Sequence, residues 1–418
     1  MDISNWDWEK GVKVIQKLRN CDTSFEWLEE PYVSLDGEKV VTLAKTEDGY
    51  KPCVNGKSWE NAYDIAWYPR FSPDGRLTCL VQEMGEWTLA VDGEHWPENY
   101  AYIWNTMFNG EGDVIAAAIQ QNGEYGMAVN GEPWSTLYVN ATEFTLSPDG
   151  KNTAAVVQTT NLDEADIFTF QKGCFSVAVN GQSWDKNFVN VWTPTFDHQG
   201  QHVAAQVRSS LYDYTIVVDG QPWEKNFLMV WEPRFNPKTK KVAAPIRMAG
   251  KWGMAEDGQV IWNPVFVQLW QHQFSQDGNH LYAIAATEFG KWTIVCDGSP
   301  WEVKINTMLT DLAVSPDGKR AAAAAKEGEK WTIMADESLW SDWYDMVWSP
   351  VFSPDSRHIG CKVEKGRKRV TIVLNGKPYK EEFSHCWDPI FSPDSQYVLI
   401  RGVQGGTYKR IVANVNDF

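Results

Sequence analysis

Residues 65–96 read IAWYPRFSPDGRLTCLVQEMGEWTLAVDGEHW, and this stretch contains one complete structural unit. The tetrapeptide Ser-Pro-Asp-Gly at 72–75 is a tight-turn sequence, because proline presets φ, aspartate bonds back to the backbone and glycine accepts positive φ. The Asp92-Gly93 pair is a strong hairpin signal, since both residues can adopt positive φ. The runs between these turns are short, apolar and rich in β-branched and aromatic residues. The stretch therefore predicts three or four short antiparallel strands.

The same unit recurs along the whole chain. The apolar residue before the Ser-Pro-Asp-Gly position is found at Val33, Phe71, Phe108, Leu146, Phe196, Phe235, Phe274, Val314, Phe352 and Phe391. The spacing is about 39 residues, except for a longer interval between Leu146 and Phe196. A fixed period of this length over ten copies indicates tandem structural repeats.

Tryptophan marks two positions in the unit, and the chain holds 23 of them. One family follows the Asp-Gly or Asn-Gly turn and comprises Trp59, Trp96, Trp134, Trp184, Trp223 and Trp301. The other family precedes the Ser-Pro-Asp-Gly turn and comprises Trp67, Trp104, Trp192, Trp231, Trp270, Trp348 and Trp387. A large side chain that returns at one position in nearly every copy suits packing between repeats, whereas an electron relay has no need of that regularity. We interpret both families as packing residues.

Short strands at this spacing predict an all-β fold, a β-propeller of about ten WD40-like repeats of about 39 residues. Solenoids of similar period are mostly helical, and helical periodicity is absent here. The alanine-rich run Arg320–Lys326 would favour a helix in isolation. Its place in the repeat predicts a strand instead, because the equivalent segments of other copies read as strands.

The last copy, Phe391–Phe418, lacks the outermost strand of the unit, and the strand-like run Val12–Leu18 precedes the first copy. We expect Val12–Leu18 to complete the last blade and close one ring, because an unpaired sheet edge promotes aggregation. Two five-bladed propellers are the alternative. The predicted organisation is an N-terminal segment at residues 1–30 and a ten-repeat propeller at residues 31–418.

Composition and charge exclude several classes of function. The net charge of −17 argues against sequence-independent binding to nucleic acid and against direct docking on an anionic membrane surface. No run approaches the length of a membrane-spanning helix, and the N-terminus is acidic where a signal peptide would be basic. The seven cysteines are scattered, with no Cys-x-x-Cys pair. These features predict a soluble, reduced, cytoplasmic protein.

The Phe-Ser-Pro-Asp-Gly turns resemble the WD40-like repeats of TolB-type propellers, although the signal peptide of that family is missing. The doubly tryptophan-tagged unit is most similar to the tryptophan-rich subunit of the Tmc transmembrane electron-transfer complex of sulfate-reducing bacteria. In that family the electron carriers sit on other subunits: a multihaem cytochrome, an iron–sulfur protein and a membrane subunit. The resemblance implies a cytoplasmic accessory subunit that is peripheral to the inner membrane and functions in sulfate respiration.

No residue pattern predicts catalysis, a cofactor or a bound metal. His198 and His202 are four residues apart, but they flank a turn, where that spacing does not place two rings together. The adjacent His385 and Cys386 would point to opposite faces of a strand. The aspartates of the repeated turns are explained by the turns themselves. We therefore expect a protein that is not an enzyme and carries no cofactor or metal.

The long interval is the one candidate site. About twelve extra residues interrupt a hairpin of the fourth copy, and insertions in repeat proteins often map to a binding face. The candidate partner-binding residues are Asp163, Glu164, Asp166, Ile167, Phe168 and Phe170. The leading hypothesis is a non-catalytic scaffold that binds protein subunits of a membrane-associated redox complex. The alternatives are a ligand-binding or enzymatic propeller that uses its central channel, and a free-standing protein-interaction adaptor.

Overall fold

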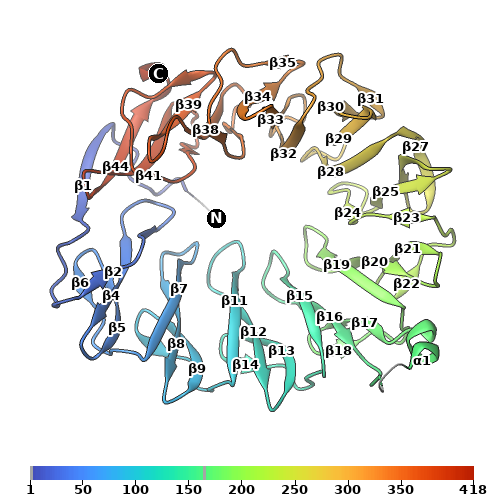
Figure 1. Cartoon of the computed structure of the whole chain (residues 1–418), viewed down its shortest axis with the longest axis horizontal. Helices are drawn as coiled ribbons and strands as arrows, with labels where there is room; N and C mark the ends of the chain where they lie inside the picture. Colours follow the sequence, from blue (N-terminus) through green and yellow to red (C-terminus); the bar gives the residue numbers. More distant parts are fainter. Residues whose placement is uncertain (1–2, 163–165) are drawn as a thin grey trace. The chain divides into compact units, whose positions relative to one another are not determined.

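A computed structural model describes residues 3–162 and 166–418, and these residues form ten small antiparallel sheets (Figure 1). Each sheet corresponds to one sequence repeat, so the fold is a β-propeller of ten blades, as predicted. Six blades have four strands in chain order. In the other four the first strand is split into two short pieces, which gives five strands. In blade 10 the outermost of these strands is the N-terminal strand. The described residues divide into two compact units, of five blades each.

The first unit comprises residues 15–226 and holds blades 1 to 5. Blade 1 consists of β2 (Trp27–Leu28), β3 (Tyr32–Val33), β4 (Val40–Thr46), β5 (Gly49–Val54) and β6 (Lys57–Ser58). Blade 2 consists of β7 (Ile65–Phe71), β8 (Leu77–Glu83), β9 (Glu86–Val91) and β10 (Glu94–His95), and blade 3 of β11 (Tyr102–Phe108), β12 (Ile115–Gln121), β13 (Glu124–Val129) and β14 (Glu132–Pro133). Blade 4 consists of β15 (Ala141–Leu146), β16 (Thr153–Gln158), helix α1 (Ile167–Lys172), β17 (Phe175–Val179) and β18 (Gln182–Ser183), and blade 5 of β19 (Asn190–Phe196), β20 (Val203–Arg208), β21 (Tyr214–Val218) and β22 (Gln221–Pro222).

The second unit comprises residues 3–14 and 227–418 and holds blades 6 to 10. Blade 6 consists of β23 (Met229–Val230), β24 (Arg234–Phe235), β25 (Val242–Met248), β26 (Lys251–Glu256) and β27 (Gln259–Phe266), and blade 7 of β28 (Gln268–Phe274), β29 (Leu281–Glu288), β30 (Lys291–Cys296) and β31 (Ser299–Pro300). Blade 8 consists of β32 (Met308–Val314), β33 (Ala321–Glu327), β34 (Lys330–Ala335) and β35 (Ser338–Leu339), and blade 9 of β36 (Met346–Val347), β37 (Val351–Phe352), β38 (Ile359–Glu364), β39 (Val370–Leu374) and β40 (Lys377–Pro378). Blade 10 consists of β41 (His385–Cys386), β42 (Ile390–Phe391), β43 (Tyr397–Gln404), β44 (Thr407–Asn414) and the N-terminal strand β1 (Gly11–Lys17).

The repeated turns have the backbone geometry that their residues predict. Gly150 in the turn of blade 4 has a φ of 76°, and its amide donates to the carbonyl of Ser147 at 2.9 Å. The hydroxyl of Ser147 donates to the Asp149 carboxylate at 2.7 Å, and this bond lowers the pKa of that carboxyl. The aspartates of these turns therefore stabilise the turn, as predicted, and hydrogen bonding keeps the Asp149 carboxyl ionised.

The Asp-Gly turns lie at the same edge of each blade as the Ser-Pro-Asp-Gly turns. Asp92 and Gly93 both have positive φ, 50° and 95°. Asp92 Oδ1 accepts from the backbone amide of Leu77, at the start of the second strand, at 2.8 Å. We call this edge the turn face of a blade. The opposite edge, where the second and third strands are joined by a hairpin, is the hairpin face.

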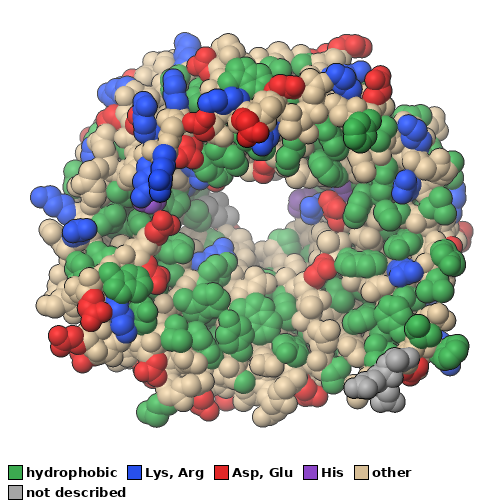
Figure 2. Space-filling model, in the orientation of Figure 1, with side chains coloured by type: hydrophobic (Ala, Val, Ile, Leu, Met, Phe, Trp, Pro, Cys, Tyr) green, Lys and Arg blue, Asp and Glu red, His purple; other side chains and the backbone are tan. Residues whose placement is uncertain are grey.

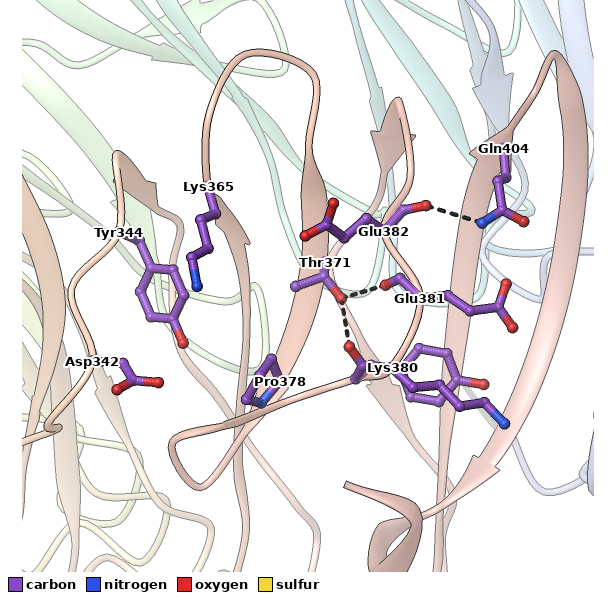
Figure 3. Close-up of a pocket in the computed structure, with 10 residues that line it drawn as sticks. Asp342, Tyr344, Lys365, Thr371, Pro378, Lys380, Glu381, Glu382 and Gln404 are labelled. Atoms are coloured by element: carbon purple, nitrogen blue, oxygen red, sulfur yellow. Dashed lines mark hydrogen bonds between the residues drawn. The ribbon is translucent and has the colours of Figure 1, made fainter.

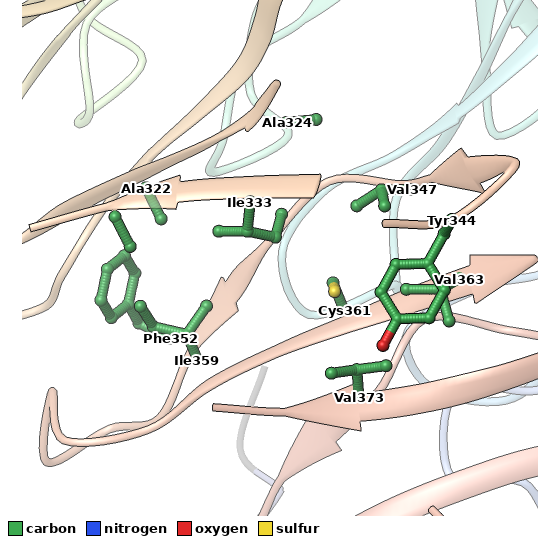
Figure 4. Packing of buried hydrophobic residues seen from close by; sticks show 11 residues of the cluster. Ala322, Ala324, Ile333, Tyr344, Val347, Phe352, Ile359, Cys361, Val363 and Val373 are labelled. Atoms are coloured by element: carbon green, nitrogen blue, oxygen red, sulfur yellow. The ribbon is translucent and has the colours of Figure 1, made fainter. Parts of the chain in front are cut away.

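The core lies between successive blades, and the alanine-rich strand β33 shows why its residues are small. Ala322 and Ala324 pack towards blade 9, against residues such as Phe352 (Figure 4). Ala321, Ala323 and Ala325 belong instead to the cluster shared with blade 7. Successive side chains of a strand point to opposite faces, so a strand between two sheets must fit both neighbours. This double burial explains why the run forms a strand although alanine favours helices.

The two tryptophan families have different environments. Trp262, one residue out of register with the first family, is 6% exposed, and a β-carbon at Gly298 of the next blade would lie 3.3 Å from its ring. Trp96 is buried in the same way beside Gly131. These residues pack between blades, as predicted. The second family shows both kinds of packing: Trp104 packs on Phe144 of the next blade, as predicted, whereas Trp67 packs on Trp87 of its own blade and remains 38% exposed.

The N-terminal strand pairs with blade 10, and the residues that follow it are linked to blade 1. β1 lies beside β44 in the sheet of blade 10, and Lys10 forms an ion pair of 2.9 Å with Asp417. A disulfide joins Cys21, which follows β1, to Cys53 in β5. This bond contradicts the predicted reduced state of all seven cysteines. The pairing could not be read from spacing, because 32 residues separate two cysteines that only the fold brings together.

Candidate functional site

The hairpin face carries a repeated aromatic pair, in which a residue of the first strand packs on one of the third strand. The Trp270 and Trp292 rings are 4.8 Å apart and nearly parallel, and those of Trp231 and Trp252 are 5.4 Å apart. Such pairs stabilise by about 0.5–1.5 kcal/mol beyond the area they bury. Equivalent pairs are Trp67–Trp87, Trp104–Tyr125, Trp192–Tyr214 and Trp387–Tyr408, and in blade 1 Trp27, two residues earlier in the first strand, packs on Tyr50. The pair thus belongs to the architecture of a blade.

In blades 2 to 4 these pairs join into one continuous line of rings. We call it the aromatic row, and it consists of Tyr68, Trp67, Trp87, Tyr102, Trp104 and Phe144. Neighbouring ring centroids are 5.5 to 6.3 Å apart. The row passes from β7 through β9 and β11 to β15, and these strands follow one another in the first unit (Figure 1).

Part of the aromatic row is open to solvent. Trp67, Tyr68 and Tyr102 are each 38% exposed, and Ile65 and Met84 beside them are 40% and 97% exposed. Figure 2 shows hydrophobic side chains gathered over β7, β11 and β15. Isolated exposed apolar residues need no explanation, whereas a contiguous patch marks an interaction site in a soluble protein.

A backbone bulge positions one end of the row. Tyr68 has a φ of 52°, and the pairing of β7 with β8 shifts between Trp67 and Arg70. Positive φ is unusual for a non-glycine residue and persists only where the surrounding structure imposes it. The same bulge occurs in β11, β15, β19, β28 and β32. The blade repeat therefore provides a fixed position, directly after the second tryptophan position or the threonine that replaces it in blades 4 and 8, at which a variable side chain is displayed.

In blades 4 and 8 the bulge residue forms a hydrogen bond with the neighbouring blade. Glu143 of blade 4 accepts from the backbone amide of Thr193 in blade 5 at 2.5 Å. Asp311 of blade 8 accepts from the hydroxyl of Ser349 in blade 9 at 2.8 Å. In blade 2 the same position holds an aromatic ring, Tyr68, which extends the row. Sequence reasoning missed this position, because the bulge follows from strand register rather than from a local motif.

Charged groups border the aromatic row. The Arg70 guanidinium lies 5.5 Å from the ring centre of Tyr68, and it donates to the carbonyl of Thr106 in blade 3. Asp64 Oδ2 accepts from the amide of Met84 at 2.9 Å, which fixes the tip of the β8–β9 hairpin beside a carboxylate. The margin of the row therefore carries one guanidinium, that of Arg70, and one carboxylate, that of Asp64.

The predicted partner-binding insertion forms a short helix at the hairpin face of blade 4. Asp163 and Glu164 lie outside the described residues. Asp166 caps α1, because its carboxylate accepts from the amide of Thr169 at 3.0 Å. Hydrogen bonding to Thr169 lowers the pKa of Asp166, which keeps the cap ionised.

Helix α1 presents apolar side chains to solvent. Ile167 and Phe168 are 60% and 75% exposed, and Phe170 is half-buried. The insertion is anchored at its base, where the amide of Thr159 donates to the carbonyl of Cys174 at 2.9 Å. In the described part of the chain, no helix combines the length and apolar character needed to cross a bilayer.

Other hairpin tips expose apolar residues in the same way. Met84 is 97%, Tyr212 79% and Phe289 95% exposed, in blades 2, 5 and 7. All three lie between the second and third strands of their blades. Met84 lies beside the exposed rings of the aromatic row, whereas Tyr212 and Phe289 are single exposed residues, which need no explanation by themselves. In blades 2 and 7 the signal in the sequence was a Met-Gly or Phe-Gly pair between two predicted strands, and blade 5 has no such pair.

A separate pocket of about 540 Å³ lies in the second unit, between blades 8, 9 and 10 (Figure 3). It is lined by Asp342, Tyr344, Lys365, Thr371, Pro378, Tyr379, Lys380, Glu381, Glu382 and Gln404. The hydroxyl of Thr371 donates to the carbonyl of Glu381 at 2.8 Å, so it is engaged in the fold. The bidentate bond from Arg369 lowers the pKa of Glu382, and burial raises the pKa of Tyr344 to about 12. Both shifts move these groups away from proton transfer near neutral pH.

Comparison with known proteins supports the fold and no finer assignment. No protein-family model matches the sequence, and no functionally characterised protein matches it significantly. The crystal structure of a eukaryotic initiation factor aligns with a TM-score of 0.51 and 16% identity, over 79% of this chain and 90% of that chain.

Two further solved structures align less closely. The β-propeller domain of Myceliophteria thermophila Cps50 (Swd1) gives a TM-score of 0.33 at 10% identity, over 65% of this chain and 98% of that one. The tricorn protease gives 0.28 at 14% identity, over 90% of this chain and 46% of that one. At such low identities, only the alignment with the initiation factor is close enough to support a conclusion, and that conclusion is the propeller fold alone.

Proposed function

We propose that this protein is a non-catalytic scaffold that binds a protein partner through the hairpin face of its first unit. The observation that carries the proposal is the aromatic row, with its exposed rings Trp67, Tyr68 and Tyr102. Aromatic side chains held in place by packing lose little conformational freedom on binding, and they dominate the energetics of protein interfaces. The net charge of −17 favours a partner with a basic surface.

The resemblance of the repeat to the tryptophan-rich subunit of the Tmc complex supports a finer proposal. The partner would then be a cytochrome, iron–sulfur or membrane subunit of an electron-transfer complex, and this chain would carry no cofactor of its own. The proposed location is the cytoplasmic side of the membrane, reached through those partners. The Cys21–Cys53 disulfide is an observation that weighs against a reducing compartment.

Replacing Tyr68 and Tyr102 together with serine should weaken partner binding by about 30-fold or more, because interface aromatics of this kind contribute about 2 kcal/mol or more. The two rings make three contacts in the row, so the free energy of unfolding should fall by about 2–4 kcal/mol, and chemical denaturation has to show that the variant is folded before binding is compared. Tyr32→Ser is the matched control, since Tyr32 is a 39% exposed tyrosine outside the row. Binding is measured by capture of the tagged full chain with detergent-solubilised native membranes, followed by titration of the recovered partner.

The haem and iron content of the captured material distinguishes the general scaffold proposal from the finer proposal of a redox-complex subunit. Recovery of haem and iron–sulfur proteins supports the redox-complex assignment, and recovery of soluble proteins alone favours a free-standing adaptor. If the double variant binds as tightly as the Tyr32→Ser control, the aromatic row is not the docking surface.

A second variant tests the insertion of blade 4. Replacing Ile167 and Phe168 with serine should leave the fold intact, because both side chains are more than half exposed and α1 has no buried residue. If α1 is part of the docking surface, association with the captured partner should weaken by about 10-fold, which corresponds to about 1.4 kcal/mol. Unchanged association, measured by the same titration, would remove the insertion from the proposed surface.

A further inference from the structure

Three side chains with metal-binding atoms meet on the turn face of blade 7. His280 lies directly before β29, Cys296 is the last residue of β30, and Asp297 begins the turn that follows. One donor atom from each side chain, Nδ1, Sγ and a carboxylate oxygen, lies within 4.8 Å of the other two. Asp297 Oδ2 is 2.7 Å from His280 Nδ1 and 3.7 Å from Cys296 Sγ.

The backbone holds these donors in position. The other carboxylate oxygen of Asp297 accepts from the amide of Leu281 at 2.9 Å, and the Asp297 amide donates to the Leu281 carbonyl at 2.9 Å. The His280 amide donates to the hydroxyl of Ser275 at 2.9 Å. One oxygen of Asp297 is therefore used by the turn, and the other faces the histidine and the thiol. Bonds of this kind orient metal ligands before the ion arrives.

The donor set and its spacing suit a tetrahedral divalent ion. Zinc binds His nitrogen, Cys sulfur and carboxylate oxygen at about 2.0–2.3 Å, which places its ligand atoms about 3.3–3.7 Å apart. The Cys296–Asp297 separation already has this value, and the His280–Asp297 hydrogen bond needs to open by less than about 1 Å. The side chains of His280 and Asp297 are 43% and 50% exposed, so the ion can enter and retain a water molecule.

Blade 5 shows which part of the cluster belongs to the general architecture. His202 Nδ1 lies 2.6 Å from Asp219 Oδ2 on the turn face of that blade, with side chains 43% and 47% exposed. The histidine–aspartate pair is thus a recurring feature of the turn. At the position of Cys296, however, blade 5 has Val218. The thiol is the addition that changes a hydrogen-bonded pair into a set of three metal ligands.

We propose that His280, Cys296 and Asp297 form a zinc site with three protein ligands and a water molecule in the fourth position. Burial raises the pKa of the Cys296 thiol, so the ion has to displace a proton on binding. The site lies in the second unit and is independent of the docking surface proposed for the first.

Titration of the chelator-treated full chain with Co²⁺ tests the proposal, because a thiolate ligand gives Co²⁺ a charge-transfer band that oxygen and nitrogen ligands do not. We expect one equivalent to bind with this band and with the visible bands of tetrahedral Co²⁺, and Zn²⁺ to displace it. Cys296→Val, which installs the blade 5 residue, should abolish the band and weaken Zn²⁺ binding by at least about 100-fold. His280→Asn should also weaken binding, and it provides a second variant if Cys296→Val does not fold.

Blade 5 supplies both controls. His202→Asn should leave the Co²⁺ spectrum unchanged, and Val218→Cys should create a second site and raise the stoichiometry from one to two. The remaining cysteines among the described residues do not compete, because four are buried and two form the disulfide. Absence of the charge-transfer band, its persistence in Cys296→Val, or failure of Val218→Cys to add a site would overturn the proposal.

Discussion

Gly49→Ala is expected to lower the free energy of unfolding by about 4 kcal/mol, which is at the severe end for a single substitution. Gly49 begins β5 with a φ of 138°, a conformation that residues with a side chain rarely adopt. A β-carbon there would also overlap the carbonyl oxygen of Tyr63. That carbonyl accepts from the amide of Tyr50 at 2.7 Å, and the side chain of Tyr63 is fully buried. The backbone therefore cannot move away without breaking a sheet contact.

Gly85→Ala separates the two causes of this loss. Gly85 occupies the corresponding hairpin of blade 2 with a φ of 86°, and no atom lies within 4 Å of its added β-carbon. It should lose only the torsional cost, about 1–2 kcal/mol. Chemical denaturation followed by tryptophan fluorescence measures both variants. Equal losses at Gly49 and Gly85 would show that the contact with Tyr63 contributes nothing.

The sequence predicted the parts of the fold that depend on local chemistry. Asp92-Gly93 and the Ser-Pro-Asp-Gly turns specify their own backbone angles, so their position fixed the strands between them. The strand β33 was predictable although its alanines favour a helix, because the repeat period shows where each segment lies in its blade. Each of these inferences uses residues close together in the chain.

Features that depend on strand register could not be predicted. The bulge at Tyr68 appears only when β7 is paired with β8, and no local motif marks it. The exposure of Trp67 depends on Trp87 in the third strand, on which its ring packs. Counting tryptophans per repeat identified an architectural position, but it could not show that Trp67 and Trp231 of the second family remain exposed.

The candidate sites were partly accessible from the sequence. The insertion of blade 4 was found from the broken period, but its helix was not, although Asp166 three residues before Thr169 is a capping signal. The zinc ligands His280 and Cys296 are too far apart to form a recognisable motif. They meet because Tyr282 pairs with Cys296 across the β29–β30 ladder, which places the residues flanking these strands side by side.

Acidification should destabilise the protein through His272, a histidine of β28 that is 2% exposed. Its Nε2 donates to the carbonyl of Ala243 in β25 at 3.2 Å, so the single proton of the neutral ring lies on Nε2. No hydrogen-bond partner for Nδ1 is found among the described residues. Burial, with a smaller contribution from the nearby Arg234 guanidinium, lowers the pKa of His272 to about 3. The charged form is therefore strongly disfavoured in the folded state.

The sign of the effect follows from the two pKa values. In the unfolded chain the pKa of a histidine is about 6.5, so below that pH the unfolded state binds a proton that the folded state does not. Stability from this group is fully present above about pH 6.5 and falls as the pH decreases towards about 3, by about 1.4 kcal/mol per pH unit. At pH 4.5 the loss should be about 3 kcal/mol, and at pH 3 about 4 kcal/mol.

His272→Gln isolates this contribution, because an amide can still donate to Ala243 and does not titrate in this range. Unfolding by denaturant at a series of pH values gives the free energy of both proteins. The difference between wild type and variant should be constant above pH 6.5 and shift steadily in favour of the variant below it. A difference between wild type and His272→Gln that stays flat from pH 7 to pH 4 would mean that His272 can be protonated inside the fold, and that the burial seen here does not exclude the proton.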